Sequence, residues 1–115
     1  MSEKRPCFVG LTVPKYQECV RFYRDAMGIP LRPGEEYVHQ ECSWHNPYFH
    51  FAIFPAGSEH PLLSFWVDDI QGAHERAVAN GARVVHGPKR LPWGLTAEYL
   101  DPEGNRVSLV QRSNP

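Results

Sequence analysis

Residues 62–81, LLSFWVDDIQGAHERAVANG, decide the fold, because the same plan occurs earlier at residues 7–28, CFVGLTVPKYQECVRFYRDAMG. Each stretch predicts a strand, then an amphipathic helix, then a glycine that ends the helix. A shift of about 54 residues superposes the two stretches and places Val13 on Val67. This repeat indicates a fold built from two similar modules, with a ligand expected in the groove where paired halves face each other.

Composition and charge are those of one soluble globular domain. The chain has 115 residues, 42% of them hydrophobic, and a net charge of −1 without a basic block. One core fits this length, and the charge gives no reason to expect nucleic acid or a membrane surface as a partner. No apolar run approaches the roughly 20 residues that span a bilayer, and the first residues carry no apolar stretch typical of a signal peptide. The cysteines Cys7, Cys19 and Cys42 lack metal-type spacing, so we expect a reduced, cytoplasmic protein.

Three further strands complete each half and give an α+β fold. The first helix carries an apolar stripe of Tyr16, Val20, Tyr23 and Met27, and either Asp68 or Asp69 caps the second. Strands are expected at 7–13, 29–32, 37–44, 48–54, 62–67, 82–86, 95–100 and 106–111, and helices at 16–27 and 70–80. The order is βαβββ-βαβββ, two modules at about residues 6–56 and 61–112 of a single domain, with the helices on one side of the sheets.

Three motifs in this order resemble the vicinal oxygen chelate superfamily, which includes glyoxalase I, extradiol dioxygenases, and fosfomycin and bleomycin resistance proteins. The motifs are the helix end Phe22–Gly28, the second helix end Ala79–Ala82 and the terminal hairpin Asp101–Leu109. The resemblance implies that each module curls into half a barrel, that modules enclose grooves with the helices outside, and that this short chain forms a homodimer. These motifs are structural and say little about chemistry.

The resemblance also places the metal ligands of the metal-dependent members, and the matching positions lack suitable side chains. They are Phe8 and Leu62 on the two equivalent strands, Ser108 on the last strand, and Ala52, or His50 after a slip of one strand repeat. Phenylalanine and leucine have no donor atoms, and a neutral serine hydroxyl is a poor ligand for zinc, nickel or iron. We therefore expect no metal and no other cofactor.

Two polar residues remain as candidates for chemistry. His50 shares a predicted strand face with Ala52 and Phe54, on the groove side, where it would orient a ligand or transfer a proton. Glu98 faces either the groove, where it would act as a base or bind a cation, or solvent, since a one-residue slip of register reverses it. The remaining histidines of the second helix and of the turns, His60, His74 and His86, are interpreted as surface or hydrogen-bonded residues.

The predicted groove is apolar and aromatic. Thr12 and Trp66 share the inward faces, while Trp44, His45 and Trp93 lie on connecting turns. The candidate ligand-binding residues are Phe8, Thr12, Trp44, His50, Ala52, Leu62, Trp66, Trp93, Glu98 and Ser108. The leading hypothesis is a homodimer that resembles the bleomycin resistance branch and sequesters a small aromatic or cationic ligand, with acidic rim residues Glu35, Glu36 and Glu41. The alternatives are a glyoxalase- or dioxygenase-like lyase or isomerase with relocated ligands, and an assembly domain with a vestigial pocket.

Overall fold

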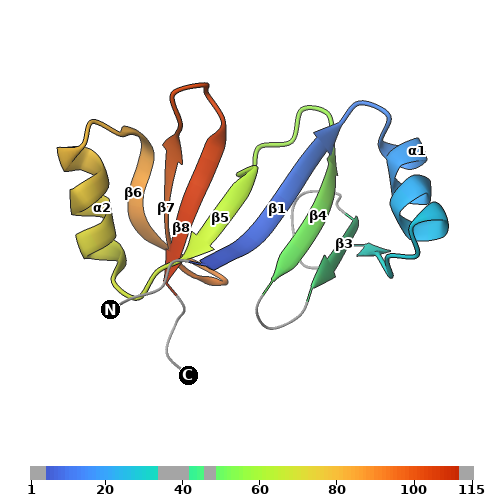
Figure 1. The fold of residues 1–115 in the computed structure, drawn as a ribbon, viewed down its shortest axis with the longest axis horizontal. Coiled ribbons are helices and arrows are strands. Elements are labelled where there is room, and N and C mark those ends of the chain that lie inside the picture. Colours follow the sequence, from blue (N-terminus) through green and yellow to red (C-terminus); the bar gives the residue numbers. More distant parts are fainter. Residues whose placement is uncertain (1–4, 34–41, 46–48, 112–115) are drawn as a thin grey trace. The chain divides into compact units, whose positions relative to one another are not determined.

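The computed structural model of the chain describes residues 5–33, 42–45 and 49–111 (Figure 1). The chain divides into two compact units, Phe8–His60 and Pro61–Pro115 together with Met1–Cys7. Each unit runs through one strand, one helix and three strands, so the predicted α+β order βαβββ-βαβββ is confirmed.

The first unit, Phe8–His60, contains β1 (Arg5–Val13) from Phe8 onward, α1 (Tyr16–Arg21), the π-helical turn η1 (Phe22–Ala26), β2 (Arg32–Pro33), β3 (Cys42–His45) and β4 (His50–Pro55). The strand order is β2-β3-β4-β1, with β1 parallel to β4 and the other pairs antiparallel. Gly28 has a φ of +74° and follows η1, as the helix-ending glycine was predicted to do.

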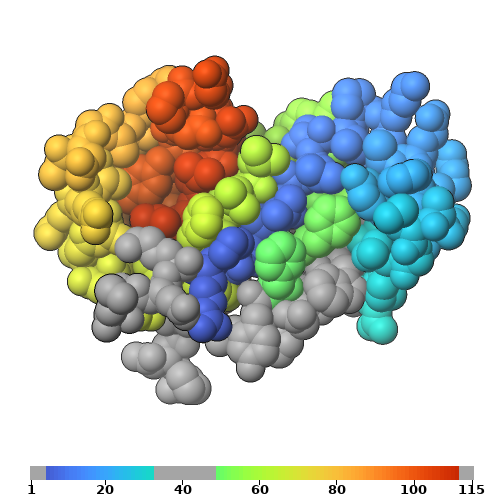
Figure 2. Space-filling view, viewed as in Figure 1, coloured from blue at the N-terminus to red at the C-terminus, as the bar shows by residue number. Residues whose placement is uncertain are grey.

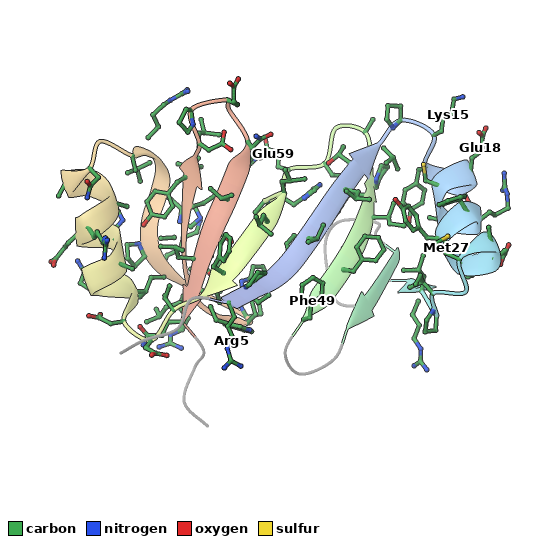
Figure 3. All side chains as sticks on the ribbon, viewed as in Figure 1. Arg5, Lys15, Glu18, Met27, Phe49 and Glu59 are labelled. Atoms are coloured by element: carbon green, nitrogen blue, oxygen red, sulfur yellow. The ribbon has the colours of Figure 1, made fainter. Side chains whose placement is uncertain are left out.

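The helix of the first unit covers one face of its sheet. Val20, Leu31 and Ile53 form a buried core between them, with Tyr23 packed beside it. Figure 3 shows Glu18 on the opposite side of α1, directed away from the sheet. The predicted apolar stripe is wrong at Met27, which is 59% exposed. The N–H of Met27 donates to Phe22 O, five residues back, and this wider turn rotates Met27 out of the stripe.

The second unit contains β5 (Leu63–Trp66), α2 (Ile70–Ala79), β6 (Arg83–Leu91), β7 (Gly94–Leu100) and β8 (Arg106–Gln111). The strand order is β5-β8-β7-β6, again with the first and last strands of the module parallel and the rest antiparallel. Strand β6 is longer than the predicted 82–86, because pairing with β7 continues to Leu91 through register shifts on both sides of His86.

Helix α2 packs on the second sheet as α1 does on the first. Val67, Ile70, Ala97 and Tyr99 form the buried core between helix and sheet. The side chain of Asp69 accepts a hydrogen bond from the N–H of Gly72 and caps the helix, as one of the two predicted aspartates. The outward side chains of α2 form a surface of this unit (yellow in Figure 2). Of the helices in the described residues, none has the length and apolar character that spanning a bilayer requires.

Candidate functional site

In each unit the sheet has one face covered by its helix and one that the helix leaves uncovered, which we call the helix-free face. Because side chains alternate along a strand, Phe51 and Ile53 of β4 pack towards α1 and their neighbours point the other way. The helix-free face of the first unit consists of Phe8, Gly10 and Thr12 on β1, paired in register with His50, Ala52 and Phe54 on β4. The prediction that His50 shares a face with Ala52 and Phe54 is therefore confirmed.

Aromatic rings dominate the helix-free face of the first unit. The rings of Phe8 and His50 meet edge to face, with centroids 5.3 Å apart and an interplanar angle of 71°. Phe8 also lies 6.4 Å from Phe54, whose side chain is buried. Such edge-on and tilted contacts are the favoured geometries of aromatic pairs. This face is therefore lined by aromatic rings in contact with one another.

His60 covers part of this aromatic surface. Its ring stacks on Phe54 with centroids 3.6 Å apart and 17° between the planes. Its Nε2 and the Thr12 hydroxyl share a hydrogen bond of 2.5 Å. A Cβ at Gly10 would come within 2.7 Å of His60 Nδ1, so the ring requires a glycine beneath it. The predicted hydrogen-bonded state of His60 is confirmed, but its place among the aromatic rings was not predicted.

The helix-free face of the second unit is polar instead. Register pairs Ser64 of β5 with Ser108 of β8, and Ser108 with Glu98 of β7. Glu98 thus lies on the face opposite α2 and is 5% exposed, so the alternative of a solvent-facing carboxylate is wrong. The buried polar side chains of this face are Ser64, Thr96, Glu98 and Ser108, each 5% exposed or less. Buried polar groups are costly unless they find hydrogen-bond partners.

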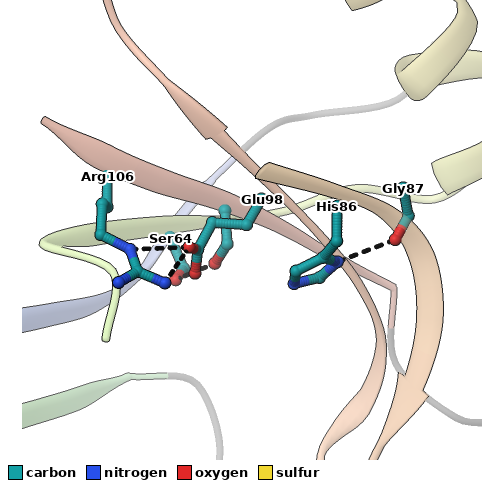
Figure 4. A network of polar contacts seen from close by, with 6 residues as sticks. Ser64, His86, Gly87, Glu98 and Arg106 are labelled. Carbon is teal, nitrogen blue, oxygen red and sulfur yellow. Dashed lines mark hydrogen bonds and ion pairs between the residues drawn. The ribbon is translucent and has the colours of Figure 1, made fainter. Parts of the chain in front are cut away.

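Each of these buried polar groups has a hydrogen-bond partner: Thr96 donates to the carbonyl oxygen of Gly94, and Figure 4 shows the contacts of the other three. The hydroxyls of Ser64 and Ser108 share a hydrogen bond of 2.5 Å. Arg106 Nε donates to Glu98 Oε2 at 2.7 Å, and Arg106 Nη2 forms an ion pair with the same oxygen. The carboxylate of Glu98 is therefore balanced inside the unit, which makes it less available as a base or as a ligand for a cation.

His86 belongs to the same part of the second sheet. Register pairs it with Glu98, and its Nδ1 donates to the carbonyl oxygen of Gly87 at 2.8 Å (Figure 4). The prediction that His86 lies in or near a turn is wrong, because β6 continues past it. His74, on α2, contacts the hydroxyl of Tyr99 through Nδ1 at 2.7 Å and thus belongs to the other face.

The remaining candidates of the second unit lie at the margins of its sheet. Leu62 precedes β5, is 40% exposed, and donates its N–H to the carbonyl oxygen of Arg106. Trp66 is half-buried and pairs in register with Val110, on the helix-free face. Trp93 lies in the turn between β6 and β7, as predicted, and is 46% exposed.

The prediction that Trp44 and His45 lie on a connecting turn is wrong. Both residues lie in β3, where Trp44 is the register partner of Phe51 and His45 that of His50 on β4. Antiparallel pairing with β4 extends β3 beyond the predicted strand end at Trp44. The predicted rim residues lie outside the described residues: Glu35, Glu36 and Glu41.

The donor set does not fit the metal centre that the resemblance would imply. Within residues 5–33, 42–45 and 49–111, no three His, Cys, Asp or Glu side chains are grouped closely enough to hold a metal ion. Of the matching positions, Phe8 and Leu62 carry no donor, and the Ser108 hydroxyl already bonds Ser64. Zinc sites require three or four nitrogen, sulfur or carboxylate ligands.

Two residues that shape these faces were missed in the sequence. Arg106 could have been found, because it lies two positions before Ser108 on one strand and therefore on the same face. His60 has no local signal of its own. The indirect signal is Gly10, since a glycine within a strand often marks the close approach of another group.

A family model described as a glyoxalase-like domain matches residues 8–110. The chain therefore belongs to the glyoxalase-like domain family, within the vicinal oxygen chelate superfamily, as the three motifs predicted.

Relatives support the same fold. The uncharacterised protein YetH of Bacillus subtilis (strain 168) is 25% identical over 114 residues, which cover 90% of this chain and 94% of YetH. The hypothetical protein BH1468 from Bacillus halodurans C-125 shares 12% identity with a TM-score of 0.72, over 98% of this chain and 97% of BH1468. Methylmalonyl-CoA epimerase from Mycobacterium tuberculosis shares 16% identity with a TM-score of 0.66, over 96% of this chain and 89% of the epimerase. At such identities the two solved structures show the fold alone.

Proposed function

We propose that this protein binds a small, flat aromatic molecule on its helix-free faces, without the family's metal centre. The observation that carries the proposal is the ring set of Phe8, His50 and Phe54, which occupies the face where the resemblance places metal ligands. Aromatic side chains bury large areas and stack on flat or cationic ligands. Small-molecule sites are usually concave and mainly apolar, with a few polar groups.

The charges of the second unit favour aromatic contact over ion pairing as the main source of affinity. The buried carboxylate of Glu98 is engaged by Arg106, so a cationic ligand would find no uncompensated charge at that position. A cationic aromatic ligand is still compatible with the ring faces of the first unit, because cations are attracted to aromatic faces. The proposed ligand is therefore an aromatic molecule, and a positive charge on it is compatible with binding but not required.

The proposal includes a homodimer that sequesters its ligand, as in antibiotic resistance by binding, in the cytoplasm. Its support is the resemblance, in which short chains complete their grooves with a second copy. Analytical ultracentrifugation tests this part directly. A monomer that binds ligand with full affinity would contradict the dimer and leave the binding site in place.

A thermal-shift screen of aromatic compounds, with elemental analysis of the purified protein, tests the function. A ligand at about 100 times its dissociation constant should raise the free energy of unfolding by about 2.7 kcal/mol. Phe8→Ala should abolish this stabilisation, while Phe22→Ala should not, because Phe22 is 52% exposed on η1. Stoichiometric, tightly held metal, or stabilisation by no aromatic compound, would contradict the proposal.

The second candidate function is a glyoxalase- or dioxygenase-like lyase or isomerase with relocated ligands. The buried polar set of the second unit, which includes Thr96, Glu98 and Ser108, favours this candidate because catalytic sites retain polar groups at some cost in stability. An enzyme of this kind would retain metal and lose turnover on His50→Ala or Glu98→Gln. Binding without turnover, unaffected by chelators, separates the first candidate from the second.

A further inference from the structure

The side chain of His60 makes the contacts that a bound heteroaromatic ligand would make. One face of the imidazole lies flat on Phe54, with 3.6 Å between centroids. One ring nitrogen, Nε2, shares a hydrogen bond with the hydroxyl of Thr12. Stacking and a single edge hydrogen bond are the two interactions by which proteins commonly orient small flat molecules.

The sheet beneath His60 is shaped to receive a ring. Gly10 and its register partner Ala52 are the smallest residues of the helix-free face, and Ala52 is fully buried. A Cβ at Gly10 would lie 2.7 Å from His60 Nδ1 and 2.8 Å from Phe8 Cε2, so any larger residue would occupy this space. The ring of Phe54 stacks on His60, and Phe8 lies beside Phe54 with 6.4 Å between centroids. The result is a floor of small residues bordered by aromatic rings.

His60 reaches this place from a loop and not from the sheet itself. After β4 the chain turns at Gly57, whose φ is +87°, and the N–H and hydroxyl of Ser58 both donate to the carbonyl oxygen of Pro55. His60 follows this turn and lies outside every helix and strand. Its ring can therefore leave the sheet without breaking hydrogen bonds of a strand ladder. Thr12, its hydrogen-bond partner, is exposed at the edge of the face.

We propose that the space over Gly10 is a subsite for a planar nitrogen heterocycle, and that His60 is its internal occupant until a ligand of the same chemistry displaces it. Phe54 provides the stacking surface of the subsite, Phe8 borders it, and the Thr12 hydroxyl contacts the ring nitrogen. This inference rests on the proposed function and deepens it, because it names the ligand class and the group that the ligand has to replace.

Free imidazole and His60→Ala provide a direct test. Imidazole should stabilise His60→Ala saturably, with a half-saturating concentration about tenfold or more below that of the wild-type protein, because an internal competitor reduces apparent affinity. Thr12→Val in the His60→Ala background should weaken this binding. The matched control is His74→Ala, whose ring is hydrogen-bonded to Tyr99 but tilted 34° with centroids 5.8 Å apart. Equal responses of His60→Ala, His74→Ala and wild type would overturn the subsite.

A measurement on the wild-type protein keeps the test valid even where His60→Ala fails to fold. Stacking on Phe54 should shift the ring proton resonances of His60 upfield in its NMR spectrum. Titration with imidazole should move these resonances towards ordinary values as the ring is displaced. Saturable imidazole binding that leaves the His60 resonances unchanged would contradict displacement.

The two proposals fail in different ways. Imidazole binding to His60→Ala, with no aromatic compound stabilising the wild type, would uphold the subsite and refute the proposed function. An aromatic ligand that binds wild type and His60→Ala with the same affinity would uphold the proposed function and refute the internal occupant.

Discussion

Replacing Arg106 by methionine removes the guanidinium that balances the buried carboxylate of Glu98. Glu98 is 5% exposed, so water cannot replace the two lost donor groups without rearrangement of the face. Breaking a buried ion pair by removing one partner costs about 3–5 kcal/mol. Because the side chain of Arg106 is 34% exposed, solvent screens part of the interaction, and we expect the lower end, about 3 kcal/mol. This corresponds to a fall in Tm of about 12 °C.

Urea denaturation of a double-mutant cycle measures this effect. Glu98→Met with Arg106→Met removes both charges and keeps the volume, so the double variant should recover most of the stability lost by Arg106→Met. The matched control is Arg24→Met. Arg24 Nε contacts Asp25 Oδ1 at 3.0 Å, but both side chains are about half exposed or more, and we expect no measurable change in the urea midpoint.

Two results would refute this reasoning about Glu98. One is an equal, small loss of stability in Arg106→Met and Arg24→Met, which would mean that solvent reaches the Glu98 carboxylate freely. The other is additivity of the two substitutions in the cycle, which would mean that the ion pair contributes nothing beyond its separate parts.

Three further predictions concern the two helix-free faces and the core. Ser108→Ala leaves the Ser64 hydroxyl buried without its partner and should lower the free energy of unfolding by about 1–2 kcal/mol in urea denaturation. The double variant Ser64→Ala with Ser108→Ala should be closer to wild type, and an additive loss would contradict the hydrogen bond. Gly10→Ala should lower stability by about 1–3 kcal/mol through overpacking, and His60→Ala should relieve part of that loss in calorimetry; no relief would place the clash elsewhere. Burial raises the pKa of Tyr99 above its usual value of 10.0, so the folded state keeps a proton that the unfolded state releases. Stability should therefore fall as pH rises above 10.0, more steeply in wild type than in Tyr99→Phe; identical alkaline profiles would contradict the shift.

The architecture could be predicted because local and repeated signals agree. Gly28 and Gly81 end the two helices with a positive φ, and Asp69 caps the second. Period-two alternation assigned the helix-free faces correctly in β1, β4 and β5. Predicted strand ends are wrong where pairing with a neighbouring strand overrides the β-propensity of the residues. Strand β6, for example, continues to Leu91 because it pairs with β7. The π-helical turn at Phe22 is likewise invisible to a pattern that assumes a period of 3.6.

The site was harder to predict than the sheet, because its key contacts join residues far apart in sequence. Alternation fixes which residues share a face, and it correctly grouped His50 with Ala52. Alternation does not predict that His60 contacts Thr12, 48 positions earlier, because the conformation of a loop sets that contact. Nor does alternation state that Arg106, rather than a ligand, balances the charge of Glu98.

The two helix-free faces share a backbone plan but differ in chemistry, because different small residues occupy equivalent positions of the repeat. In both units the first strand runs parallel to the last, and the central register pair joins small residues: Gly10 with Ala52 in one, Ser64 with Ser108 in the other. Small pairs leave room above the sheet. In the second unit the hydroxyls bond each other, so the pair satisfies its own polar groups. In the first unit the pair carries no side-chain polar atom, and the ring of His60 stands over Gly10 instead. Equivalent positions thus give a polar face in the second unit and an aromatic face in the first. The space over the aromatic face is filled by His60, which comes from a loop. Ligand exchange should therefore be sought first on the aromatic face.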